Sequence, residues 1–109
     1  MKKSQILVDI GLDENMVPEE LHWTAEDGGV QKQATKAVFL TVWDDDAKEA
    51  LRIDLWTKDM TMDDMKVFFM QTIHSMANTY SRATNDEDTV QKMQAFAKEF
   101  AISSGLIEE

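Results

Sequence analysis

A change of hydrophobic period between Leu51 and Tyr80 constrains the fold more than any other feature of the chain. Leu51, Ile53 and Leu55 alternate with polar residues, and a period of two is typical of a half-buried strand. After a polar turn, apolar residues recur at the spacing of an amphipathic helix. A strand that leads directly into a long helix predicts an α+β protein.

Two helices are predicted in the C-terminal half, at about 62–82 and 87–104. Thr61 stands three residues before Asp64, an arrangement close to a capping box, and Gly105 fits a C-terminal cap. The helix at 87–104 is expected to start after Asn85. The expected apolar stripes are Met65, Phe68, Phe69, Thr72, Ile73, Met76 and Tyr80 in the first helix and Val90, Met93, Ala97, Phe100 and Ala101 in the second.

The N-terminal segments 4–12 and 21–25 each alternate between apolar and polar residues. Val17-Pro18 between them disfavours helix and marks a turn. We therefore expect a hairpin with a loose connection, with Leu21, Trp23 and Ala25 facing inward, and we expect it to end at Asp27-Gly28-Gly29.

Residues 30–43 fit two structures. The residues Ala34, Ala37, Val38, Thr41 and Val42 follow helical spacing, and the polar opening favours a helix, so we predict a helix here. The alternative is a strand, because residues 38–43 are rich in β-branched and aromatic side chains. That strand would form a hairpin with residues 50–56 across the DDDAKE turn.

Together these elements predict one α+β domain spanning residues 1–109, a length typical of a single domain. We expect a small, mainly antiparallel sheet of three to four strands, with one face packed by the two C-terminal helices. This arrangement would bury the apolar side of each element.

The chain is strongly acidic, with 21 acidic against 11 basic residues and a net charge of -10. Lys and Arg do not cluster, so nucleic acid and anionic membrane surfaces are not expected partners. Acidity favours solubility, and the sharper alternative is an acidic face for a basic protein partner. No apolar run approaches the ~18 residues of a membrane span, and no secretory signal is visible, so we expect no membrane insertion and a cytoplasmic location.

Catalytic and metal-binding motifs are missing from the sequence. It has no cysteine, no GxSxG element and no phosphate-binding glycine loop. Asp44-Asp45-Asp46 with Glu49 lacks the EF-hand pattern, and His22 and His74 lie far apart without a second zinc ligand at the usual spacing. Asp9 and Asp54 could act as a carboxylate pair only on adjacent strands. We predict no enzyme, no catalytic residue, no metal and no cofactor.

The strongest interaction candidates surround the end of the strand at 51–56. Trp56 falls on the opposite side of the strand from Leu51, Ile53 and Leu55, so we expect it to be partly exposed. Tryptophan is enriched at interaction hot spots, and methionine adds adaptable apolar surface, although both also fill cores. The predicted protein-interaction residues are Trp56, Lys58, Asp59 and Met60, and a homodimer that buries the Trp56 face is left open.

Two segments carry a family resemblance: WDDDAKEALRIDLWTKDMTMDDMKVFFMQTIHSMANTYSRATND and ILVDIGLDENMVPEELHWTAEDGGV. They resemble the gliding motility-associated protein GldC family of Bacteroidetes, and the specific part is LRIDLWTKDM followed by DDMKVFF. The resemblance implies an accessory factor for gliding motility, a process linked to type IX secretion. It supplies no catalytic residue, cofactor or ligand.

The predicted function is therefore that of a non-enzymatic accessory protein of gliding motility. It would act by contact with other proteins, including gliding-motility components. The alternative is a binding module for a small apolar molecule, with a pocket between sheet and helices lined by Trp, Met and Phe side chains.

Overall fold

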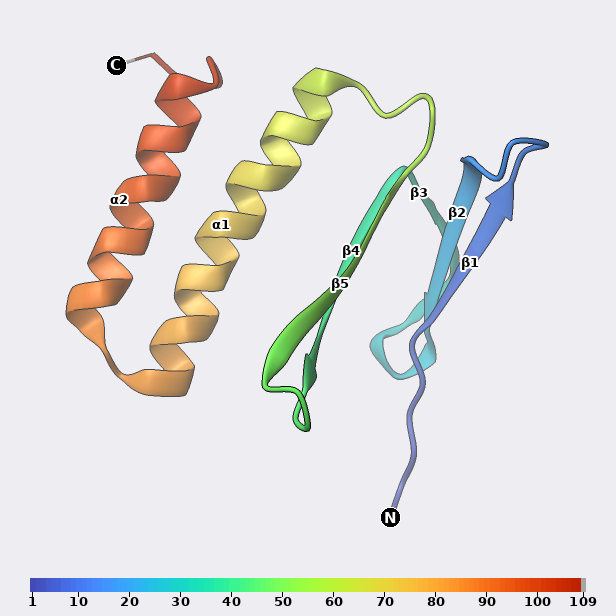
Figure 1. Ribbon diagram of the computed structural model, residues 1–109, viewed down its shortest axis with the longest axis horizontal. Coiled ribbons are helices and arrows are strands. Elements are labelled where there is room, and N and C mark those ends of the chain that lie inside the picture. The colour runs from blue at the N-terminus through green and yellow to red at the C-terminus, as the bar shows by residue number, and fades with distance from the viewer. Residues whose placement is uncertain (109) are drawn as a thin grey trace. The chain divides into compact units, whose positions relative to one another are not determined.

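The computed structural model describes residues 1–108, and the chain divides into two compact units, Met1–Met60 and Thr61–Glu109. The first unit contains the strands and the second contains the two helices (Figure 1). The predicted α+β class with a C-terminal helix pair is confirmed. Five strands are present among the described residues, in one sheet of three and one of two.

The three-stranded sheet is formed by β1 (Leu7–Leu12), β2 (Pro18–Ala25) and β3 (Val30–Thr35) in that order. β1 and β2 pair antiparallel, with Ile10 opposite Leu21, so the predicted N-terminal hairpin is confirmed. The short 3-10 turn Glu26–Gly28, followed by Gly29 at φ 78°, leads into β3. Leu21 is 1% exposed and anchors this sheet.

The prediction of a helix at residues 30–43 is wrong, because this segment forms β3 and most of β4 (Ala37–Asp44). β4 pairs antiparallel with β5 (Glu49–Trp56), with Val42 opposite Leu51, as the strand alternative proposed. Helical propensity is a weak preference, and cross-strand pairing of β-branched and aromatic side chains overrides it. The strand count exceeds three to four because this segment supplies two strands.

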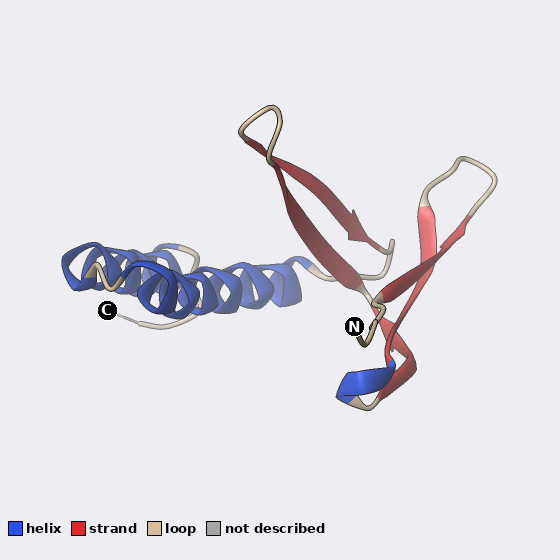
Figure 2. Ribbon diagram, turned by 90° about the horizontal axis from the view of Figure 1, so that it is seen from below, coloured by secondary structure: helices blue, strands red, loops and turns tan. Residues whose placement is uncertain are grey.

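The chain bends between β3 and β4 at Lys36. Figure 2 shows the three-stranded sheet and the pair β4 and β5, here the β4–β5 ribbon, running apart from one another beyond this bend. The backbone N–H of Thr57 donates to the Lys36 carbonyl at 2.9 Å, and Thr57 is 2% exposed. Thr57 therefore fastens the end of β5 to the start of β4.

The second unit consists of α1 (Met62–Thr84) and α2 (Glu87–Ser103), which agrees with the predicted ranges. Thr61 Oγ1 accepts from the Asp64 backbone N–H at 3.0 Å, so the predicted cap is present. Asn85, at φ 57°, ends α1, and Asp86 caps α2. Gly105 adopts φ 87° after α2, as a C-terminal cap requires.

The two helices pack along a seam of small side chains. Ala77 of α1 and Val90, Ala97 and Ala101 of α2 are buried, and the Phe69 and Phe100 rings stack with centroids 6.5 Å apart. Small residues at a helix contact bring the helices close together. Neither helix of the described chain is both long enough and apolar enough to cross a membrane.

Candidate interaction surface

The register of the β4–β5 ribbon separates its side chains into two faces. Residues directly opposite each other in an antiparallel pair lie on the same side of a sheet. One side, here the aliphatic face, consists of three cross-strand pairs: Val38 with Leu55, Leu40 with Ile53, and Val42 with Leu51.

Within the first unit, the aliphatic face is incompletely buried. Four of its members are about half exposed, at 46% for Leu40, 53% for Val42, 53% for Leu51 and 55% for Ile53. No charged residue interrupts the three pairs. Single exposed aliphatic residues are ordinary, but a contiguous apolar patch marks a binding surface.

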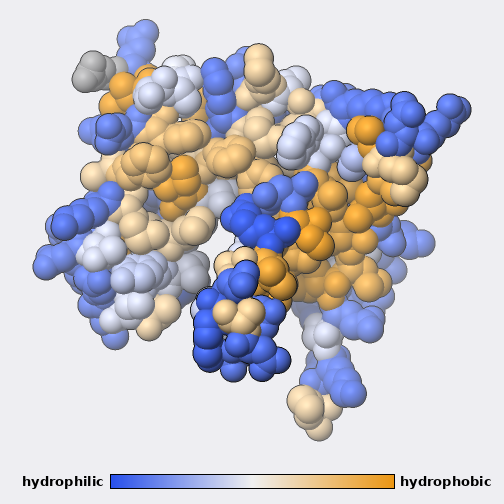
Figure 3. Space-filling model, in the orientation of Figure 1, coloured by the Kyte–Doolittle hydropathy of each residue, from blue (hydrophilic) through white to orange (hydrophobic). Residues whose placement is uncertain are grey.

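The turn between β4 and β5, here the acidic turn, closes one end of this face with Asp44, Asp45, Asp46 and Glu49. Asp44 Oδ1 accepts from the backbone N–H groups of Asp46 at 3.1 Å and Ala47 at 3.2 Å. Lys48 Nζ donates to Asp45 at 2.9 Å and is the one base within the turn. Figure 3 shows hydrophilic residues (blue) at this end of the ribbon and hydrophobic residues (orange) over the strands.

Hydrogen bonds hold the Asp45 carboxylate in its charged form. They come from Lys48 and from the Trp43 indole N–H, which donates at 3.2 Å, and they lower the pKa of Asp45 below its ordinary value. Lys48 is thus hydrogen-bonded to one of the four carboxylates of the acidic turn, which has no second basic residue.

The other face of the ribbon pairs its charges within the chain. Arg52 donates to Asp54 at 2.8 Å, and its guanidinium carbon lies 5.5 Å from the centroid of the Phe39 ring. The Asp54 carboxylate raises the pKa of Arg52. Trp56 lies on this face and is 53% exposed, as the alternation of residues 51–56 predicts.

The three predicted candidates after Trp56 lie in the turn that follows β5. Lys58 forms an ion pair with Asp13 of the β1–β2 connection. This pair lowers the pKa of Asp13 and raises the pKa of Lys58. The contact ties the turn to the first sheet, so Lys58 has a structural partner within the first unit.

Asp59 is likewise engaged within the first unit. It accepts from Thr57 Oγ1 at 2.6 Å and lies 3.5 Å from Lys36 Nζ, and these groups lower its pKa, with Thr57 first. Met60 is half-buried and donates its N–H to the Thr57 carbonyl at 3.1 Å. The four candidates are neighbours in the sequence, two of them have ion-pair partners within the first unit, and their role in binding stays a prediction.

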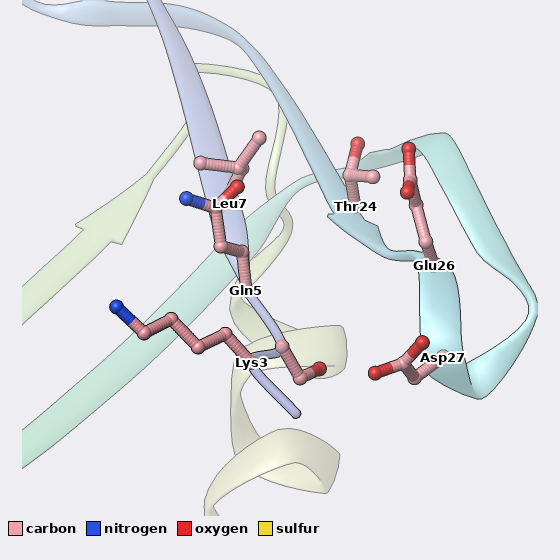
Figure 4. A pocket seen from close by; sticks show the side chains of 7 residues that line it. Lys3, Gln5, Leu7, Thr24, Glu26 and Asp27 are labelled. Atoms are coloured by element: carbon pink, nitrogen blue, oxygen red, sulfur yellow. The ribbon is translucent and has the colours of Figure 1, made fainter. Parts of the chain in front are cut away.

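Surface cavities lie among the strands of the first unit, and three of them are described by their lining residues. The first, of about 250 Å³, separates the N-terminal residues Lys3, Gln5 and Leu7 from Glu26 and Asp27 (Figure 4). A second, of about 320 Å³, lies beside Leu21, His22 and Lys36, and a third, of about 490 Å³, beside Asp13 and Lys58. Charged and polar side chains contribute to all three, and Trp, Met and Phe to none of them, so they differ from the apolar pocket expected for the alternative function.

The residues considered for catalysis or metal binding do not form a site. Asp9 lies in β1 and Asp54 in β5, which belong to different sheets. His22 lies in β2 and His74 in α1. Over residues 1–108, no group of three or more His, Asp or Glu side chains could hold a metal ion.

The sequence-based prediction missed Leu40 and Val42 as surface residues, because it placed them in a helix. The usable signal was the alternation of Val38, Leu40 and Val42, followed by a polar turn and a second alternating segment. Leu51 and Ile53 were recognised as one face of a strand, but the exposure of that face depends on the complete arrangement of the first unit.

One comparison with known proteins relates the chain to a family. The model of the family described as gliding motility-associated protein GldC-like matches residues 18–105. No match is found among curated proteins or among solved structures. The matched residues are most of the chain and include the β4–β5 ribbon and both helices, so the chain belongs to the GldC-like family of gliding motility-associated proteins.

Proposed function

We propose that this protein is a non-enzymatic accessory protein of gliding motility that binds another protein through the aliphatic face of the β4–β5 ribbon. Membership of the GldC-like family supports the link to motility. The open aliphatic face supports binding, and it is the observation on which the proposal rests.

An uncovered two-stranded ribbon has little stability of its own. A two-stranded hairpin is at best marginally stable in water without packing on its apolar side. Full burial of a Leu, Ile or Val side chain contributes about 1.5–3 kcal/mol. Four half-exposed side chains therefore offer roughly 3–6 kcal/mol on binding.

This energy is comparable to the lower part of the association cost, roughly 4–15 kcal/mol. The aliphatic face alone therefore supports weak binding, and a stable complex needs further contacts. Trp56 lies on the opposite face of the ribbon, so its exposed indole, which offers a large rigid area, contributes only where the partner also reaches that face. Lys58, Asp59 and Met60 follow it as proposed rim contacts, with Lys58 and Asp59 limited by their existing ion pairs.

Gliding cells that encode this chain provide the test. We expect Leu40→Asn/Ile53→Asn to abolish colony spreading while the protein stays at its normal level on immunoblots. Thr41→Asn is the matched control, because residue 41 lies on the opposite face of β4. Normal spreading by the double variant would overturn the proposal.

The oligomeric state of the purified chain shows whether a second copy, rather than a different protein, covers the aliphatic face. We expect the purified chain to remain monomeric in size-exclusion chromatography with light scattering. A dimer that Leu40→Asn/Ile53→Asn dissociates would show that a second copy, rather than a different protein, occupies the aliphatic face.

A further inference from the structure

We infer that the segment covering the aliphatic face is an amphipathic helix of the partner protein, with Lys or Arg at the end that lies beside the acidic turn. This inference rests on the proposed function and adds the chemistry of the partner.

The shape of the aliphatic face suits a helix laid along it. β4 and β5 are eight residues each, which corresponds to a length of about 26 Å. A helix of about 18 residues has the same length. A helix with one apolar stripe is the usual cover for a sheet with one apolar face.

Charge is unevenly distributed along this face and gives the bound helix a direction. The three aliphatic pairs carry no charge, and Asp44 and Glu49 then form the last cross-strand pair. At the other end, Lys36 and Lys58 are each paired with an aspartate. Glu19 and Glu20 also lie beside Lys36 and Asp59, but within the β4–β5 register of the aliphatic face a carboxylate pair occurs only at the acidic turn.

The same charges disfavour a second copy as occupant. Another copy would bring a net charge of -10 and an identical acidic turn, whereas a partner with basic residues would be attracted to it. Two backbone N–H groups donate to the Asp44 carboxylate, so this group is preorganised in the unbound protein.

The test uses the full chain and two labelled synthetic peptides of about 18 residues. Both are helix-forming with a leucine stripe; one carries lysines at one end and the other carries glutamates at the same positions. Fluorescence anisotropy should show at least about tenfold tighter binding of the lysine peptide at low salt. The difference should shrink as salt is added, because exposed charges are screened.

Two variants locate the binding. The Leu40→Thr/Ile53→Thr variant should bind the lysine peptide at least about tenfold more weakly. It removes apolar contact but keeps residues that suit strands. The Asp44→Asn/Glu49→Gln variant should bind the lysine peptide about threefold more weakly and show a smaller preference for the lysine peptide over the glutamate peptide. An asparagine at position 44 retains the oxygen that accepts from the turn.

Glu26→Gln/Asp27→Asn is the matched control, because it removes the same number of carboxylates from the turn between β2 and β3. It should leave both affinities unchanged, and circular dichroism should show the same folded signal for every variant. Equal weakening by this control would mean that overall charge, not the acidic turn, attracts the peptide, and would overturn the inference.

The outcomes separate this inference from the proposed function. If neither peptide binds, or both bind equally, the inferred partner chemistry is wrong even when Leu40→Asn/Ile53→Asn abolishes spreading. If that variant spreads normally, the proposed function fails and the inference fails with it. A dimer that the Leu40→Thr/Ile53→Thr variant dissociates also overturns the inference.

Discussion

The helix pair and the β4–β5 ribbon both expose large apolar side chains, but only the helix pair also has a buried apolar seam. The helix pair buries Ala77, Val90, Ala97 and Ala101 along its own seam. The ribbon carries six aliphatic residues on one face and buries none of them.

The difference follows from the geometry of the two elements. Two helices can turn apolar stripes toward each other. The side chains of a two-stranded ribbon stand roughly perpendicular to the sheet, so its strands cannot cover their own face. Only another segment can cover such a face, which is why we propose the ribbon, and not the seam, as the binding surface.

Overpacking the seam should give the largest effect on stability. Ala77 is 0% exposed, and Ala77→Leu should lower the free energy of unfolding by about 2 kcal/mol, because there is no room for the added atoms. Urea denaturation followed by circular dichroism measures this. Ala83→Leu, at an exposed position of α1, should cost less than about 0.5 kcal/mol, and a similarly small cost at position 77 would mean that the seam is loose.

Removing the cap of α1 should have a smaller effect. Thr61→Ala deletes the oxygen that accepts from Asp64 N–H and should cost about 1 kcal/mol of unfolding free energy in the same measurement. Thr61→Ser keeps the hydroxyl and should recover most of the loss. Equal stability of the alanine and serine variants would show that this hydrogen bond contributes little to the stability of the helix pair.

Changing the ribbon should cost less still in the isolated protein. Ile53 is already about half exposed, so Ile53→Thr should lower the free energy of unfolding by less than about 1 kcal/mol. A loss of about 2 kcal/mol or more in urea denaturation would contradict this expectation. Such a loss would mean that the aliphatic face is covered in the purified protein.

The two regions also differ in how far sequence predicts them. The bounds of α1 and α2 follow from local signals: Thr61 and Asp64 at the start, Gly105 at the end, and a helical spacing between. The alternation of residues 51–56 gave both β5 and the exposure of Trp56. Short-range patterns were sufficient in both cases because each element depends on its own residues.

Residues 30–43 could not be predicted in the same way. Their polar opening favours helix, and the deciding contribution is pairing with β5 across the acidic turn. The ion pairs of Lys58 with Asp13 and of Asp59 with Lys36 also join residues distant in sequence. Packing of the helix pair on a sheet, and a single domain, stay predictions.

Acid should lower the stability of the helix pair by protonating Asp86, which lies between α1 and α2. This effect on stability should be the smallest of those considered. Hydrogen bonds from Thr89 and from the Tyr80 hydroxyl, at 3.0 Å, lower the pKa of Asp86 below its ordinary 3.8. A lowered folded-state pKa stabilises the fold above the unfolded value, and that stability is lost as pH falls through the folded value.

The urea midpoint of the wild-type protein should therefore fall between neutral pH and pH values below about 3.8 more steeply than that of Asp86→Asn. Tyr80→Phe keeps the carboxylate but removes one hydrogen bond, so its pH dependence should lie between the two. Identical pH dependence in all three proteins would exclude Asp86 as the titrating group.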